Sequence, residues 1–206
     1  MRPDEIEGES FRIILQELGP HAFSARELPI IQRVIHATAD FEYASLLAFS
    51  PTAIVDGIRA LRSGCQILTD VQMTAVGISQ SYLQRFGGSV RCVVSEPKTV
   101  ALARAEGITR TAAAIRRLVD NLPGAVVALG NAPTALFETL RLAQAGYRPA
   151  LVVGVPVGFV NAAESKAALQ ESDLPYITVQ GRKGGSTVAA AIVNALLRLA
   201  AEESNA

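Results

Sequence analysis

From Gly64 onward, short apolar segments alternate with segments of helical pattern, and this alternation constrains the fold more than any other feature. Five segments rich in Val, Ile and Leu lack a strict polar–apolar alternation, which is typical of strands buried on both faces of a sheet. They are 65–70, 90–96, 125–130, 150–155 and 176–180. Helical patterns follow at 97–106, 111–121, 133–145, 161–171 and 186–201. We therefore predict a three-layer α/β/α, flavodoxin-like doubly wound parallel sheet of about five strands.

The first 63 residues show only helical patterns. The segment "SFRIILQELGP" has apolar residues at helical spacing, and "FSAREL" contains a capping box of Ser24 with Glu27 that would start a second helix. A third helix is expected in "SPTAIVDGIRALRSG", with Ser50 as its N-cap. We predict a single domain over 1–206, in which 1–63 form a helical arm and 64–201 form the parallel α/β core.

Composition and charge exclude several classes of protein. The chain has 19 basic and 19 acidic side chains, and this balance argues against binding to nucleic acid. The longest apolar run, "ALVVGVPVGFV", is shorter than the roughly 20 residues of a membrane span, and the charged start "MRPDEIEGES" is no secretory signal. Cys65 and Cys92 are expected to be buried free thiols, and no metal-ligand spacing occurs. We expect a cytoplasmic protein without a membrane partner or a protein-bound metal.

The segments after the predicted strands are candidates for a ligand site, because open parallel sheets bind ligands beyond the carboxyl ends of their strands. These segments are "TDVQM", "SEPKT", "GNAPTAL", "GVPVGFVNAAES" and "GRKGGST". Helix N-terminal ends at Asn161 and Ser186 suit carboxylates or phosphates, although the same residues also suit plain tight turns. "GRKGGST" lacks the spacing of a phosphate-binding loop, so nucleotide binding is only weakly indicated.

Titratable side chains offer two interpretations. Asp70 and Glu96 end adjacent predicted strands and could pair as acid and base, although single carboxylates at strand ends are common. His36 lies in the apolar "RVIHATADFEY", where it is either a satisfied core histidine or a general acid facing a cavity. Asp40, four residues on, would share its helix face and stabilise the imidazolium. The residues alone favour a structural histidine and leave the general acid open.

Several segments in this order resemble precorrin-8X methylmutases, enzymes of cobalamin biosynthesis. They are "SFRII", "RVIHATADFEYA", "FSP", "TDVQM", "GNAPTAL", "GVPVGFVNAAESKAAL" and "GRKGGSTVAAAIVNAL", and the resemblance covers roughly 6–200. It implies an isomerase that moves a methyl group between adjacent ring C carbons of precorrin-8X or cobalt-precorrin-8, giving hydrogenobyrinate or cobyrinate without a cofactor. It also implies a homodimer with sites near the subunit interface, and hand-over of the tetrapyrrole to other enzymes of the pathway. "LLAFSP" is less polar than the family pattern.

The resemblance also implies roles for individual residues. His36 matches the family histidine that protonates a ring nitrogen, and Ser10 and Arg110 match a serine and an arginine that contact the substrate. The loops add further expected contacts to the substrate, whose carboxylates suit cationic side chains and helix N-terminal ends: Asp70, Met73, Asn131, Ala132, Gly158, Phe159, Arg182, Lys183, Gly184, Gly185 and Ser186. "HATADFEY" and "GRKGGS" favour the cobalt-containing substrate, in which the metal belongs to the substrate. The alternatives are a non-catalytic tetrapyrrole carrier and a phosphate- or nucleotide-binding flavodoxin-like regulator.

Overall fold

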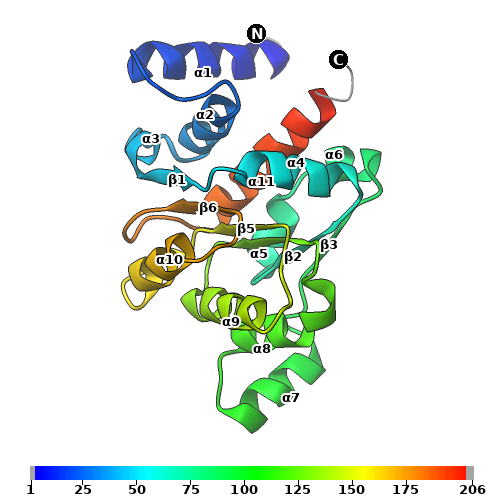
Figure 1. Ribbon diagram of the computed structural model, residues 1–206. Helices are drawn as coiled ribbons and strands as arrows, with labels where there is room; N and C mark the ends of the chain where they lie inside the picture. The colour runs from blue at the N-terminus through cyan, green and yellow to red at the C-terminus, as the bar shows by residue number, and fades with distance from the viewer. Residues whose placement is uncertain (1–2, 203–206) are drawn as a thin grey trace.

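The structure, a computed structural model, describes residues 3–202 and contains a six-stranded sheet in the order β1-β6-β5-β4-β2-β3 (Figure 1). The strands are β1 Leu47–Phe49, β2 Gln66–Thr69, β3 Ser89–Arg91, β4 Val126–Leu129, β5 Leu151–Gly154 and β6 Tyr176–Val179. Strands β2 to β6 pair in parallel, in the order of the flavodoxin-like fold. The predicted fold class and its five parallel strands are confirmed.

Strand β1 was not expected from the sequence, which indicated only helices in the first 63 residues. It lies in "LLAFSP" and pairs antiparallel with β6, with Leu47 opposite Val179. Ser50 follows it, and the Ser50 hydroxyl accepts the N–H of Tyr176 at 2.9 Å, so it does not cap the next helix as predicted. A strand of three half-buried residues is too short to leave a periodic pattern.

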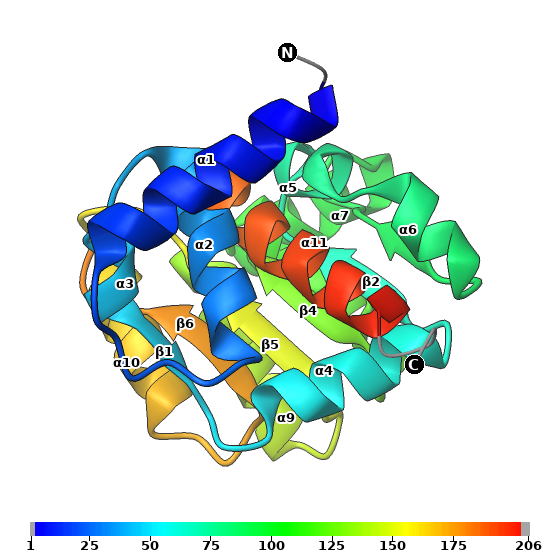
Figure 2. The ribbon, with the colours of Figure 1, turned by 90° about the horizontal axis from the view of Figure 1, so that it is seen from above.

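Helices cover both faces of the sheet. They are α1 Pro3–Leu18, α2 Glu27–Thr38, α3 Tyr43–Leu46, α4 Ala53–Arg62, α5 Gln72–Gly77, α6 Gln80–Arg85, α7 Pro97–Glu106, α8 Arg110–Arg117, α9 Pro133–Gln144, α10 Ala162–Gln170 and α11 Ser186–Glu202. Helices α4 and α11 lie on one face, and α2, α5 and α6 pack against α11 (Figure 2). Helices α8, α9 and α10 cover the other face, with α7 outside α8. Helices α3, α5 and α6 were not expected.

Strand β4 shows why the predicted strands lack alternation. Val126 and Ala128 belong to the core under α11, whereas Val127 and Leu129 belong to the core under α8 and α9. Both faces of the strand are buried, so every position of the strand is apolar. Strand β3 differs, because it lies at the edge of the sheet and is only partly buried. It is accordingly shorter than the predicted segment 90–96.

The N-terminal arm joins the core through α2. The predicted capping box is confirmed, since the N–H of Ser24 donates to Glu27 Oε2 at 2.8 Å and the N–H of Glu27 donates to Ser24 Oγ at 3.2 Å. One side of α2 packs on α11, and Ile14 of α1 packs on Ile31 and Ile35 of α2. Helix α4, expected in the arm, instead packs on the sheet beside α11. No helix within 3–202 is long and apolar enough to span a bilayer.

Candidate active site

His36 lies in the last turn of α2 and is exposed, so it is not a core histidine. The helix ends at Thr38, because Ala39 adopts a left-handed conformation with φ 52° while its N–H still bonds to the carbonyl of Ile35. The imidazole ring contacts the ring of Phe11 with 5.4 Å between centroids. It makes no hydrogen bond to the residues that the structure describes. Both ring nitrogens are therefore available to a ligand.

Asp40 does not stabilise the His36 imidazolium as the sequence suggested. Because α2 ends before it, the Asp40 carboxylate turns to the ammonium of Lys183, which also pairs with Glu42 at 2.7 Å. The Lys183 ammonium lowers the pKa of Asp40, and the two carboxylates raise the pKa of Lys183. The charge of Lys183 is thus compensated within the protein. The ion pairs join the segment after α2 to the loop after β6.

The loop after β6 carries five of the predicted site residues, and glycine is required at one of them. Gly184 has φ +152°, and a Cβ atom there would lie 2.1 Å from the carbonyl oxygen of Val155. The N–H of Gly185 donates to that oxygen at 2.9 Å, so the loop rests directly on the end of β5. Ser186 then starts α11 and is nearly buried. The close approach of the two backbones fixes the loop.

Lys166 of α10 is hydrogen-bonded to the backbone of the same loop. Its side chain is only 1% exposed, and its ammonium donates to the carbonyl oxygen of Lys183 at 2.6 Å. Burial lowers the pKa of Lys166 to about 8. The sequence did not single out this residue, because a lysine in an amphipathic helix is normally exposed. Only the tertiary structure shows it beneath the glycine loop.

Arg182 has a different environment from Lys183. Its guanidinium lies 5.5 Å from the ring centroid of Phe159, which is 84% exposed on the loop after β5. The carbonyl of Arg182 accepts the N–H of Gly158 at 3.2 Å, which brings the two loops together. Among residues 3–202, no carboxylate pairs with Arg182. Its positive charge is available to an anionic ligand.

Asp70 directly follows β2 and is fully buried. Its carboxylate accepts the N–H groups of Gly130, Asn131 and Ala132 at 3.3, 2.7 and 2.8 Å. Burial raises the pKa of Asp70, while these three N–H bonds oppose the rise. The side chain therefore holds the loop after β4 in place. Glu96, its suggested partner in acid–base chemistry, instead pairs with Arg117 at 2.8 Å.

A hollow of about 250 Å³ brings two predicted residues next to the end of α2. It lies between α2, α5 and α11, with Met73 and Ser186 in its wall and Ala37, the neighbour of His36, at its edge. The full lining is Arg33, Ala37, Met73, Gly77, Ser186, Thr187, Ala190, Ala191 and Asn194. The N-terminal end of α11 provides backbone N–H groups there. A ligand larger than this hollow would extend over exposed side chains such as Met73.

Two predicted residues lie apart from this hollow. Arg110 starts α8 under the opposite face of the sheet, at the edge of another hollow of about 470 Å³. The hydroxyl of its neighbour Thr109 lies 2.7 Å from the hydroxyl of Thr134, just after the loop held by Asp70, so the start of α8 lies close to the start of α9. The Ser10 hydroxyl donates to the carbonyl of Ile6 within α1. Its neighbour Phe11 contacts His36.

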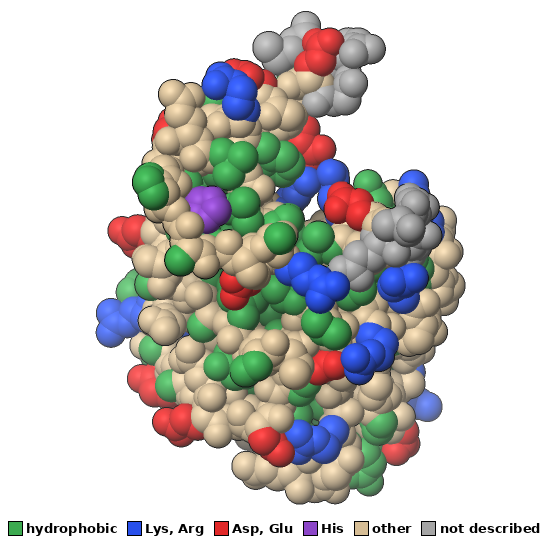
Figure 3. All heavy atoms as spheres, turned by 45° about the horizontal axis from the view of Figure 1, so that its top comes forward, with side chains coloured by type: hydrophobic (Ala, Val, Ile, Leu, Met, Phe, Trp, Pro, Cys, Tyr) green, Lys and Arg blue, Asp and Glu red, His purple; other side chains and the backbone are tan. Residues whose placement is uncertain are grey.

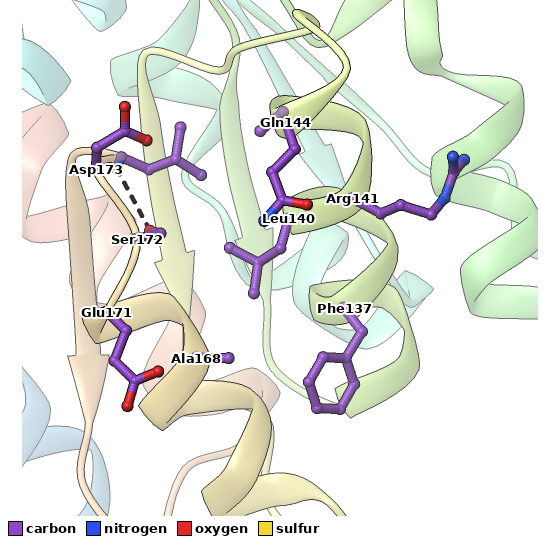
Figure 4. A pocket seen from close by; sticks show the side chains of 10 residues that line it. Phe137, Leu140, Arg141, Gln144, Ala168, Glu171, Ser172 and Asp173 are labelled. Atoms are coloured by element: carbon purple, nitrogen blue, oxygen red, sulfur yellow. Dashed lines mark hydrogen bonds between the residues drawn. The ribbon is translucent and has the colours of Figure 1, made fainter.

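A hollow of about 630 Å³ between α9 and α10 contains none of the predicted site residues (Figure 4). It lies near the C-terminal ends of these two helices, away from the carboxyl ends of β4 and β5. Its lining is Phe137, Leu140, Arg141, Ala143, Gln144, Ala168, Glu171, Ser172, Asp173 and Leu174. Arg141 and Asp173 are already paired, with Glu138 and Arg148. Nothing in this hollow resembles an active site.

Fold and loops together define a doubly wound α/β domain with a candidate site for an anionic small molecule at the carboxyl ends of its strands. The family model "Precorrin-8X methylmutase" matches residues 5–199. The chain is 46% identical to the cobalt-precorrin-8 methylmutase of Priestia megaterium, covering 97% of this chain and 89% of the relative. It is 47% identical to that of Salmonella typhimurium, covering 95% of each.

A solved structure agrees with these relatives. The precorrin-8X methylmutase of Thermus thermophilus superposes with a TM-score of 0.91 at 48% identity, covering 97% of both chains. The chain belongs to the precorrin-8X methylmutase family, and it is an isomerase. The resemblance noted in the sequence is confirmed. Within residues 3–202, no group of His, Cys, Asp and Glu side chains is arranged to hold a metal ion.

Proposed function

We propose that this chain moves a methyl group between adjacent ring C carbons of a precorrin-8-type tetrapyrrole, with His36 as the proton donor. The observation that carries the proposal is that the His36 imidazole is exposed and has no hydrogen-bond partner among the described residues, next in sequence to Ala37, which lines the hollow between α2, α5 and α11. A proton given to a ring nitrogen withdraws electrons from the conjugated system. The methyl group then migrates in a 1,5-shift, and the proton returns to the imidazole. Substrate and product are isomers, so the step needs no oxidant.

Substrate binding would use the unpaired cations and the helix ends. Arg182, on the loop after β6, and Arg110, at the start of α8, would each take a carboxylate of the substrate. Lys183 is held by Asp40 and Glu42, so we assign it to positioning the loop. Asp70 is buried under the loop after β4 and likewise supports Asn131 and Ala132. Met73 and Phe159 would supply apolar contact to the macrocycle.

The substrate form is proposed to be cobalt-precorrin-8. The relatives at 46% and 47% identity are cobalt-precorrin-8 methylmutases, and the Pseudomonas aeruginosa relative named precorrin-8X methylmutase is 44% identical. The sequence identities to the two kinds of relative differ little, so an assay is needed to decide which substrate form the enzyme prefers. Comparing kcat/KM for the metal-free and the cobalt-containing substrate tests this choice, and a higher value for the metal-free form contradicts it.

We propose that the chain acts as a single domain and assembles as a homodimer. Exposed apolar side chains lie on α5 and on the loop after β5, and a second copy would cover them and deepen the shallow hollow. They are Met73, Val76, Val157, Phe159 and Val160. Sedimentation equilibrium at micromolar concentration is expected to give twice the chain mass, and Val160→Glu is expected to shift it toward the monomer. A monomeric wild type contradicts the dimer. The expected cytoplasmic location stays a prediction.

The decisive experiment incubates the protein with each substrate form and follows absorbance and product mass. An isomerase changes the spectrum and leaves the mass unchanged, whereas a non-catalytic carrier binds without conversion. His36→Asn should fold and bind, while single turnover falls by about 10²–10⁴, the usual effect of losing a general acid. His21→Asn, at the other histidine, is the matched control and should keep the wild-type rate. A His36→Asn variant with more than about a tenth of the rate contradicts the role of His36.

A further inference from the structure

Phe11 of α1 lies between a cation and the His36 imidazole. The Arg33 guanidinium carbon is 4.6 Å from the Phe11 ring centroid, and the His36 ring is 5.4 Å away at an interplanar angle of 59°. Both distances are within the range of favourable cation–π and tilted aromatic contacts. The His36 imidazole has no other ring contact and no hydrogen bond within 3–202. Phe11 is therefore the one described side chain that can restrict the orientation of the imidazole through a specific contact.

Phe11 is itself held by an ion-pair network. Glu7, one helical turn earlier on α1, pairs with Arg33 of α2 and accepts two hydrogen bonds of 3.2 Å from Arg198 of α11. Arg33, Arg198 and Phe11 border a hollow of about 220 Å³ between α1, α2 and α11, and basic side chains are visible beneath the arm (Figure 3). The Arg33 side chain is largely buried. Helix α1 is thus docked in a register that places Phe11 on His36.

We propose that Phe11 is a positioning residue for His36, which keeps the imidazole pointing at the substrate nitrogen and makes the N-terminal arm part of the catalytic apparatus. The inference rests on the proposed function, in which His36 donates the proton. A histidine side chain has two free torsions, and proton transfer requires one orientation of its ring. The contact with Phe11 removes part of that freedom before the substrate binds. Removing it is expected to lower the rate of the bound reaction by about 3- to 10-fold.

The first test is independent of activity. The chain has two histidines, so the imidazole C–H region of a proton NMR spectrum has few signals, and His36→Asn assigns them. Phe11→Leu should move the His36 signals by removing the ring current and leave those of His21 in place. Phe23→Leu is the matched control, because the Phe23 ring stacks on the His21 ring with 5.2 Å between centroids. It should move the His21 signals and leave those of His36 in place. Unmoved His36 signals in Phe11→Leu overturn the inference.

The second test is a double-mutant cycle in single turnover. Phe11→Leu should slow bound substrate 3- to 10-fold at unchanged substrate affinity, and Phe11→Tyr, which keeps the ring, should restore the rate. In the His36→Asn background, Phe11→Leu should cause no further loss. An equal loss in both backgrounds, a loss of affinity in place of rate, or a Phe11→Leu rate equal to wild type overturns the inference. If His36→Asn itself keeps the wild-type rate, the proposed acid fails first, and that outcome is seen without any Phe11 variant.

Discussion

Lys166→Met tests whether a charged amine is buried beneath the glycine loop. The Lys166 side chain is 1% exposed, and burial lowers its pKa from 10.5 to about 8. One pKa unit corresponds to about 1.4 kcal/mol, so keeping this amine charged in the folded state costs at most about 3 kcal/mol at neutral pH. The methionine variant removes the charge at similar length. It also leaves the carbonyl of Lys183 without its partner, which costs about 1–3 kcal/mol.

The sign of the pH effect follows from the lowered pKa. Between pH 8 and 10.5 the unfolded chain binds more protons at Lys166 than the folded chain does, so the contribution of Lys166 to stability rises with pH in this window. The penalty is fully present below pH 8 and is gone above 10.5. The variant lacks this group. The free energy of unfolding of the wild type minus that of Lys166→Met should therefore rise by up to about 3 kcal/mol from pH 7.5 to 10.5.

Urea denaturation of both proteins across this pH range measures the difference. The subtraction cancels groups common to both, including Cys65, whose thiol pKa burial raises to about 11. Lys98→Met, at an exposed lysine of α7, controls for the loss of any lysine charge and should give a difference that does not change with pH. A Lys166→Met difference that is flat within about 0.5 kcal/mol would refute the buried, charged lysine.

Three further predictions, which use four substitutions, test the surroundings of the site. Gly184→Ala should lower the free energy of unfolding in urea more than Gly185→Ala does. Both positions have a φ that favours glycine, which costs an alanine about 1–3 kcal/mol, but only a Cβ atom at position 184 would clash with the Val155 carbonyl oxygen. Equal losses contradict this. Asp70→Asn should lose about 2–4 kcal/mol in the same assay, since an amide cannot accept three N–H groups, and a loss below about 1 kcal/mol argues against that network. Arg110→Ala should weaken substrate binding by about 10- to 100-fold at unchanged bound turnover, and the opposite split assigns Arg110 to the chemistry.

The parts of the fold that could be predicted from the sequence are those with a strong local pattern. Strands β4 and β5 lack polar residues because both of their faces are covered, and the helices after β4, β5 and β6 start within a residue or two of the predicted positions. Strand β1 has three residues, and α5 and α6 have six each, which is too short for a period to be recognised. Their positions depend on packing against α11 and β6 rather than on local preference.

The sequence predicted which loops form the candidate site, but not which side chains contact one another within it. Asp40 was expected to serve His36 because the two are four residues apart, and this required a helix that continues to Asp40. The left-handed turn at Ala39 ends α2 first, and the carboxylate finds Lys183, 143 positions away. Lys166 and Phe11 carry no local signal either. Their roles depend on which carbonyl and which ring they contact in the folded chain.

These long-range contacts join the segment that carries the proposed proton donor to the loop proposed to bind an anion. Asp40 lies four residues after His36, on the segment that leaves α2, and its ion pair with Lys183 ties that segment to the loop after β6. The Lys166 ammonium donates to the carbonyl of the same Lys183. The loop is therefore fixed at Lys183 through both its side chain and its backbone, while its neighbour Arg182 has no carboxylate partner among the described residues. A substrate carboxylate bound at Arg182 would be held at a set distance from the end of α2, and thus from the imidazole that is proposed to protonate the ring.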